Sequence, residues 1–111
     1  MARFIIGDIV VVPFPFSNLS NSKRRPALVL SNLNGDDVIL CQITSQSKKD
    51  FYAVGLQKED FDNGSLNKIS QIRPNRIFTA DKNIILYKIG NLKKQKFNDV
   101  VENIYEIIRK K

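Results

Sequence analysis

The sequence contains no histidine in its 111 residues and only one cysteine, Cys41. Without histidine the chain cannot build a two-histidine nuclease site, a Ser-His or Cys-His triad, or a histidine-ligated zinc site. One cysteine forms no internal disulfide, and its place in an apolar run predicts a buried hydrophobic residue rather than a nucleophile. Any catalysis must therefore rely on other side chains.

Glycine and proline are also scarce, with five and four copies, which argues against disorder or a linker-joined pair of domains. The length and the 42% hydrophobic content predict one domain over residues 1–111 with one core. No apolar run approaches the roughly 20 residues that span a bilayer, and the N-terminus has no signal-peptide core. We expect a cytoplasmic protein with no membrane partner.

Acidic residues are few relative to basic ones, 11 against 18, so the net charge is +7. This balance suits a polyanionic partner. The acids are scattered along the chain. The tightest group, Glu59, Asp60 and Asp62, is more typical of a solvated turn than of a metal site. We expect no metal and no other cofactor.

A β-hairpin is the strongest local signal in the sequence. Two apolar runs, 26–32 and 38–44, predict strands, and Asn34-Gly35 between them is typical of a tight hairpin turn. If these two residues are central in the turn, the numbers of facing residues add to 69. The sequence thus predicts a register as well as a hairpin.

That register places Arg25 opposite Thr44, at the open end of the hairpin. A turn centred one residue later would instead place Thr44 opposite Ala27, next to Arg25. In both cases a guanidinium and a hydroxyl meet at the end of an otherwise mostly apolar hairpin. The clusters Lys23-Arg24 and Lys48-Lys49 flank this corner and would give it a basic rim.

The rest of the chain predicts further strands and one helix. Strands are expected at 8–16, 52–56, 67–73, 76–79 and 83–89. The first should become an edge or bend at Pro13, since proline cannot donate to a sheet ladder. Residues 58–64 predict a turn, and Pro74-Asn75 predicts a break between two strands. From Phe97 to Ile108 apolar residues recur with helical spacing, so we expect an amphipathic helix packed on a small barrel. Its Phe97 and Tyr105 are expected to be core residues rather than a base-stacking surface.

An arginine and a hydroxyl without histidine or metal permit a restricted chemistry. Arginine stays protonated, binds phosphate bidentately and stabilises charge in a transition state. Such a site needs a nucleophile from elsewhere, and RNA carries one in its 2′-hydroxyl. On pattern alone the alternative stays open that Arg25 caps a strand and Thr44 is an ordinary strand residue.

Four segments together resemble the MazF/PemK family of toxin ribonucleases. They are Gly7-Asp8-Ile-Val, Arg24-Arg25-Pro26-Ala-Leu-Val-Leu30, Gln42-Ile-Thr44-Ser-Gln46 and Ser70-Gln-Ile-Arg73. The order and spacing carry the resemblance, which covers the chain from Ile6 to about the predicted C-terminal helix. No single one of these segments is specific by itself.

The resemblance implies a mainly β fold, an SH3-like barrel of antiparallel strands with a C-terminal helix, forming a homodimer. It implies cleavage of single-stranded RNA to a cyclic phosphate and a 5′-hydroxyl. The family's catalytic arginine precedes the proline of its Arg-Pro motif, which corresponds to Arg25. The family's catalytic threonine or serine ends its Ile-Thr motif, which corresponds to Thr44.

Further contacts to RNA are expected from basic and polar residues around this corner, namely Lys23, Arg24, Ser45, Gln46, Lys48, Lys49 and Arg73. The resemblance also implies an acidic, flexible antitoxin segment encoded by a neighbouring gene. The loop Ser17–Lys23 departs from the longer, glycine-rich loop of many members, and that loop helps select RNA. The alternative function is a non-catalytic relative that binds nucleic acid or inhibits a protein such as a topoisomerase.

Overall fold

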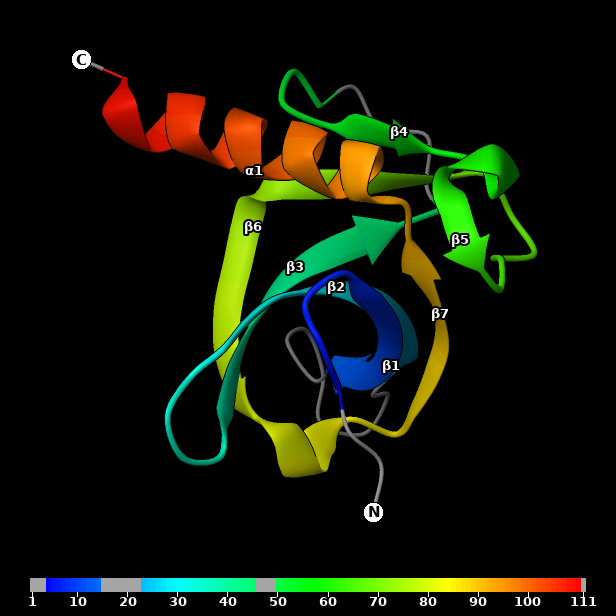
Figure 1. The fold of residues 1–111 in the computed structure, drawn as a ribbon, viewed down its shortest axis with the longest axis vertical. Helices are drawn as coiled ribbons and strands as arrows, with labels where there is room; N and C mark the ends of the chain where they lie inside the picture. Colours follow the sequence, from blue (N-terminus) through cyan, green and yellow to red (C-terminus); the bar gives the residue numbers. More distant parts are fainter. Residues whose placement is uncertain (1–3, 15–22, 46–49, 111) are drawn as a thin grey trace.

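The structure, a computed structural model, describes residues 4–14, 23–45 and 50–110 (Figure 1). These residues form a mainly β fold, in which one seven-stranded antiparallel sheet curls into a half-barrel and a C-terminal helix lies across one end. The predicted fold class, an SH3-like barrel with a C-terminal helix, is confirmed in this form. None of the helices within the described ranges is long and apolar enough to cross a membrane.

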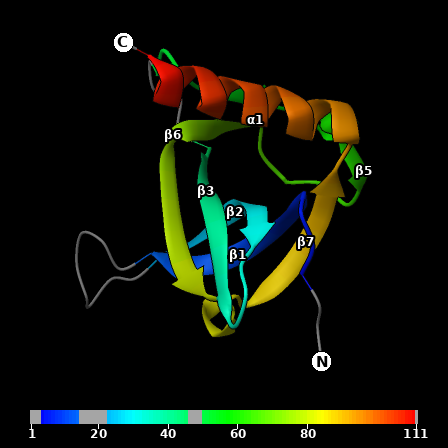
Figure 2. The same ribbon diagram turned by 60° about the vertical axis from the view of Figure 1, so that its left-hand side comes forward.

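The strands in chain order are β1 (Asp8–Phe14), β2 (Lys23–Asn32), β3 (Asp37–Thr44), β4 (Val54–Leu56), β5 (Phe61–Asn63), β6 (Ser70–Asp81) and β7 (Tyr87–Leu92). The helical elements are the 3-10 helices η2 (Lys58–Asp60) and η3 (Lys82–Ile84) and the α-helix α1 (Lys94–Arg109). Across the sheet the order is β4-β6-β3-β2-β1-β7-β5. In Figure 2, β6 lies to the left of β3 and β7 to its right, both beneath α1.

Alternating side chains divide the core into two clusters on opposite faces of the strands. The helix-side cluster packs against α1 and contains Ile9, Leu28, Cys41, Ile43, Leu56, Phe61, Ile72, Leu92 and Val100. The far-side cluster contains Val10, Val12, Ala27, Val29, Val38, Leu40 and Ile85. Burial of each large aliphatic side chain contributes roughly 1.5–3 kcal/mol, so both faces of the central strands hold the fold together.

The strand β1 has two neighbours at its start and one at its end. It pairs with β7 from Asp8 to Val11, whereas its pairing with β2 continues to Phe14. Pro13 lies in the part that pairs with β2 alone. The prediction that this strand becomes an edge at Pro13 is therefore confirmed for the described residues.

The β2–β3 hairpin has the predicted register near its open end, although its turn differs from the predicted one. The turn is closed by the Leu33 amide donating to the Asp37 carbonyl, and Gly35 has a positive φ of 87°. The first pairs after the turn add to 70, one more than predicted. A bulge at Leu30 restores the value of 69, which the pairs from Val29 to Ala27 then keep. The predicted two-residue turn is wrong, and the bulge compensates for it.

The strand β6 is continuous where two strands were predicted. Its pairing with β3 passes from Ile72 opposite Ile43 to Ile77 opposite Cys41. Residues 73–76 on β6 therefore face a single residue of β3, and β6 bends sharply beneath α1 (Figure 1). Proline is tolerated here because this bend takes its nitrogen out of the ladder.

Two smaller predictions also need correction. The segment 58–64 is not only a turn, since it contains η2 and the strand β5, which pairs with β7. Gly64 has a positive φ of 78°, and any side chain there would collide with the backbone of Ile89 and Gly90. The strand expected at 83–89 begins later, at Tyr87, because η3 occupies the first residues.

The helix α1 covers the barrel with only part of its apolar face. Val100 is buried and Phe97 is partly buried, and both pack in or against the helix-side cluster. In contrast, Val101, Tyr105 and Ile108 are 42, 50 and 72% exposed. The prediction that Tyr105 is a core residue is therefore wrong.

Candidate functional site

The predicted catalytic pair, Arg25 and Thr44, lies at the ends of two neighbouring strands. The β2–β3 ladder ends at the pair Ala27–Gln42, two residues before Arg25 on β2 and two residues before Thr44 on β3. Beyond that pair, Arg25 and Thr44 are paired only with the strands on their other sides. Arg25 faces Val12 of β1, and Thr44 faces Gln71 of β6. The pair thus lies just beyond the last paired residues of the β2–β3 ladder.

Both side chains belong to the same face of the sheet. Arg25 pairs with Val12, a member of the far-side cluster, and facing residues of an antiparallel pair share a face. Thr44 follows Ile43, which belongs to the helix-side cluster, so alternation places Thr44 on the far side as well. Arg25 and Thr44 thus lie at the end of the far-side cluster, where apolar packing gives way to polar groups.

The two residues differ in exposure. Thr44 is 4% exposed, whereas Arg25 is partly buried and is preceded by the exposed Lys23 and Arg24. Within the part of the chain that the structure describes, the guanidinium of Arg25 makes no ion pair. Its charge is therefore available to an anion that approaches this corner.

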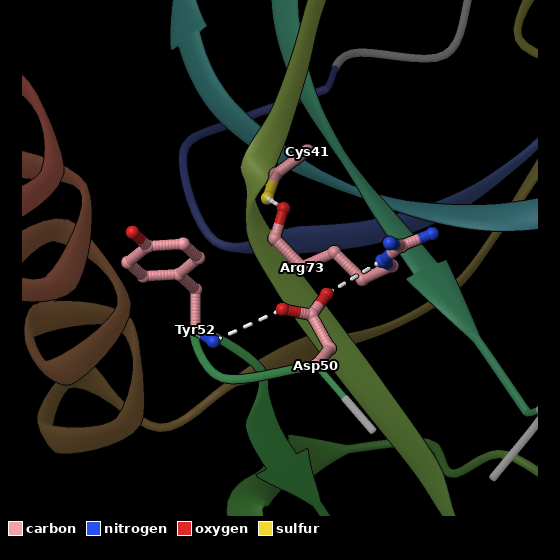
Figure 3. Close-up of polar contacts among 4 residues, drawn as sticks. All are labelled: Cys41, Asp50, Tyr52 and Arg73. Atoms are coloured by element: carbon pink, nitrogen blue, oxygen red, sulfur yellow. Dashed lines mark hydrogen bonds and ion pairs between the residues drawn. The ribbon is translucent and has the colours of Figure 1, made fainter. Parts of the chain in front are cut away.

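A second polar cluster lies at the bend of β6 and involves the predicted RNA contact Arg73 (Figure 3). Its Nε donates to Asp50 Oδ2 at 2.8 Å, and the two side chains are 14 and 6% exposed. The backbone N–H of Tyr52 donates to Asp50 Oδ1 at 3.0 Å. At the other end, the Cys41 thiol donates to the Arg73 carbonyl at 3.0 Å. Arg73 is thus fixed through both its side chain and its backbone.

Two pKa values in this cluster are shifted, one by hydrogen bonding and one by burial. The hydrogen bond from Arg73 lowers the pKa of Asp50 below its ordinary value of 3.8, with further help from Tyr52 and from the charge of Arg76. Burial raises the pKa of Cys41 to about 12. Asp50 is therefore a carboxylate at neutral pH, and Cys41 is a thiol. The prediction that Cys41 is a buried hydrophobic residue is confirmed.

The remaining predicted contacts are only partly within the described chain. Ser45 is exposed directly after β3, beside Thr44, and Lys23 and Arg24 are exposed at the start of β2. Gln46, Lys48 and Lys49 lie outside the described residues, as does the loop Ser17–Lys23 except for its last residue. The roles of all these residues stay predictions.

Sequence reasoning missed Asp50 and Tyr52 as parts of this region. Asp50 is 23 positions from Arg73 in the chain, so no local pattern joins them. One signal was present, because aspartate commonly accepts a hydrogen bond from the amide two residues later, as Asp50 does from Tyr52. Among the described residues, no group of three or more possible metal ligands comes together.

One comparison with known proteins identifies the family. Residues 6–108 match the family model described as PemK-like, MazF-like toxin of type II toxin–antitoxin system. Among curated proteins, no sequence matches this chain.

Several solved structures share the fold at low sequence identity. MazF in a MazE–MazF crystal structure from Deinococcus radiodurans is 18% identical, covers 100% of both chains and has a TM-score of 0.78. An endoribonuclease in complex with its cognate antitoxin from a mycobacterial species is 13% identical over 98% of both chains, with a TM-score of 0.76. The Mycobacterium tuberculosis toxin MazF-mt6 is 18% identical over 91% of this chain and 95% of its own, with a TM-score of 0.71. Since the family model spans nearly the whole sequence, the chain belongs to the PemK/MazF family of type II toxin–antitoxin toxins.

Proposed function

We propose that this protein is a metal-independent endoribonuclease toxin that cleaves single-stranded RNA, including messenger RNA, as one domain over residues 1–111. The observation that carries the proposal is the placement of Arg25 and Thr44 on one face, just beyond the last pair of the β2–β3 ladder. A partly buried cation and a hydroxyl then lie at the same end of the sheet. That arrangement suits a phosphodiester whose own 2′-hydroxyl is the nucleophile.

In this mechanism the 2′-oxygen forms a bond to phosphorus and the bond from phosphorus to the 5′-oxygen breaks. The 2′-hydroxyl loses its proton, the 5′-oxygen gains one, and the products are a 2′,3′-cyclic phosphate and a 5′-hydroxyl. Arg25 stays protonated and stabilises the negative charge of the pentavalent phosphorane. Thr44 orients the 2′-hydroxyl or a phosphate oxygen by hydrogen bonding.

The test is to incubate the purified protein with mixed-sequence RNA in a chelator and to map the new ends. Ends that accept phosphate from a kinase without prior phosphatase treatment would identify 5′-hydroxyls. A single 2′-deoxy nucleotide at a mapped cut site should abolish cleavage there, because it removes the nucleophile. Cleavage that persists at the 2′-deoxy site would contradict the mechanism.

The role of Thr44 is tested with Thr44→Val and Thr44→Ser. Valine has nearly the same shape without the hydroxyl, so kcat should fall by about tenfold or more, while serine keeps the hydroxyl and most of the rate.

RNA that stays intact with the wild type across many sequences, with growth arrest that survives Arg25→Ala, would favour a non-catalytic inhibitor of another macromolecule.

The protein should be held inactive by an acidic antitoxin segment from a neighbouring gene, and it should act as a cytoplasmic homodimer. The family assignment supports this, and solved relatives were crystallised with MazE or a cognate antitoxin. The net charge of +7 suits carboxylates that compete with RNA for Arg25. Titrating the antitoxin's C-terminal half should inhibit cleavage competitively with RNA and less strongly at high salt. Tight binding with an unchanged cleavage rate would contradict occlusion of the site.

A further inference from the structure

The ion pair between Asp50 and Arg73 differs from the other ion pairs of the described residues. Its atoms lie 2.8 Å apart, whereas the pairs Lys82–Asp36, Lys88–Asp8 and Lys96–Asp60 are 3.5–3.8 Å apart. Both of its side chains are less than 15% exposed. Removing two charges from water costs about as much as the pair regains, so such a pair is weak evidence of a purely stabilising role.

Both partners are fixed from separate parts of the fold. Asp50 accepts the Tyr52 amide, and the Tyr52 hydroxyl accepts a hydrogen bond of 3.0 Å from Lys110, the residue that caps α1. Arg73 is held at its carbonyl by Cys41 of β3. The guanidinium therefore has one defined position, set by the end of the helix on one side and by a neighbouring strand on the other.

The backbone of Arg73 lies near Thr44, where residues 73–76 of β6 face Gln42 of β3. Arg73 lies two residues after Gln71, the partner of Thr44, on the strand next to β3. Arg25 is on β2, which borders β3 on the side opposite β6. The strands that carry the two arginines are therefore about 10 Å apart, with the strand of Thr44 between them. Figure 3 shows the Arg73 side chain reaching from β6 toward β3, with its terminal nitrogens beyond the Nε that binds Asp50. Those nitrogens carry donors that Asp50 does not use in the structure.

A second observation at the same place points to a ligand. The side-chain oxygen of Gln71 is buried, and the described part of the chain offers it no hydrogen-bond partner. Buried polar atoms are normally satisfied, and exceptions often lie where a ligand binds. Gln71 faces Thr44 across the ladder and lies on the same strand as Arg73, so this unsatisfied acceptor is next to both residues.

We propose that Asp50 is a positioning residue that holds Arg73 as a second phosphate contact for RNA, across Thr44 from Arg25. This inference rests on the function proposed above. Asp50 itself touches no substrate. It acts through Arg73, binding Nε and leaving the terminal nitrogens directed at a phosphate next to the scissile one. Single-stranded RNA then spans β2, β3 and the bend of β6.

The test compares Asp50→Asn with a matched control, Asp60→Asn. The amide introduced by Asp50→Asn keeps one oxygen to accept the Tyr52 N–H, but an NH2 group replaces the oxygen that accepts from Arg73 Nε. The variant therefore loses both the charge and the hydrogen bond that fix Arg73. Asp60 is also a carboxylate that accepts a backbone N–H, from Gln57 at 2.8 Å, and pairs with a lysine, Lys96, at 3.5 Å. It belongs to η2 and no part of the proposed site includes it. Both variants remove a carboxylate that pairs with a cation and accepts a backbone N–H, but only Asp50→Asn should affect RNA.

Two readouts are measured for each variant: KM for cleavage, and Kd for a mixed-sequence RNA with 2′-O-methyl groups at every position. Asp50→Asn should raise both by about tenfold, since a misplaced cation loses much of its contact, while Asp60→Asn leaves both unchanged. Equal KM and Kd values for the two variants would overturn the proposal. Intact RNA with the wild type would overturn the proposed cleavage, and the Kd values would still decide the role of Asp50.

A double-mutant cycle separates action through Arg73 from a general effect on the fold. In an Arg73→Met background, Asp50→Asn should no longer change Kd, because the side chain that Asp50 positions is gone. Arg73→Lys is the second background and keeps a charge if the methionine variant does not fold. Independent, additive effects of the two substitutions on Kd would show that Asp50 does not act through Arg73.

Discussion

The two arginines that flank Thr44 are held in opposite ways. Arg25 makes no ion pair within the described chain, whereas Arg73 is paired with a buried carboxylate and anchored at its carbonyl. An unpaired cation keeps its charge for a ligand but has a loosely defined position. A paired cation has a defined position but part of its charge is neutralised. The site thus combines one residue suited to charge stabilisation with one suited to alignment.

The largest expected effect is the loss of cleavage rate when Arg25, the arginine without an ion pair in the described chain, is replaced. Arg25→Ala should lower the cleavage rate by about 100- to 1000-fold, as loss of a charge-stabilising donor does in other enzymes. Arg25→Lys should recover only part of the rate, because lysine cannot bind phosphate bidentately. The thermal midpoint should change little, since no ion pair of Arg25 is lost. Single-turnover cleavage and a melting curve of each variant measure the two quantities.

Changes to the Asp50–Arg73 pair should lower the free energy of unfolding. Arg73→Met leaves Asp50 buried without its cation, and breaking such a pair costs about 3 kcal/mol of unfolding free energy. Urea unfolding measures this loss. The double variant Asp50→Asn/Arg73→Met should recover part of it, because no buried charge remains. If Arg73→Met alone is as stable as the wild type, water already solvates the charge of Asp50 and the pair contributes little.

The same comparison can be made with pH alone. Because the pKa of Asp50 is lowered in the folded protein, its contribution to stability is complete above its ordinary value of 3.8 and is lost as the pH falls through the lowered value. The difference in unfolding free energy between wild type and Asp50→Asn should therefore be constant near neutral pH and shrink below 3.8. Unfolding in urea at a series of pH values checks this. A difference that grows with acidity would reverse the assigned sign.

The smallest effect is expected from the exposed cations beside Arg25. Lys23→Gln or Arg24→Gln should each reduce the slope of log K against log salt by about 0.7 if the residue contacts one phosphate of single-stranded RNA. Cut-site preference should not change, because phosphate contacts carry no sequence information. An altered preference with the original slope would show that these residues read bases.

The sequence predicted the parts of the fold that depend on local pattern. The alternation in β2 and β3 and the helical spacing of α1 were sufficient, and the face shared by Arg25 and Thr44 followed from the register. The turn was misjudged by one residue, and only the bulge at Leu30 kept that inference correct. The outcome was right although one step of the reasoning was wrong.

Features that depend on contacts between distant residues were not predictable. Pro74 predicts a strand break, yet β6 continues because four of its residues bend around one residue of β3. The strand β5 is only three residues long, too short for alternation to be recognised. Asp50 stands alone in a polar loop, and its importance arises only when the fold brings Arg73 to it.

Cys41 can report local opening of the fold without an introduced probe. It is the only cysteine of the sequence, it is fully buried, and its pKa of about 12 keeps it unreactive toward alkylating reagents in the closed state. Modification therefore requires β3 and the bend of β6 to separate, which also releases the Arg73 carbonyl. The rate of thiol labelling in the unmodified wild-type protein thus measures how often this corner opens, with no introduced probe.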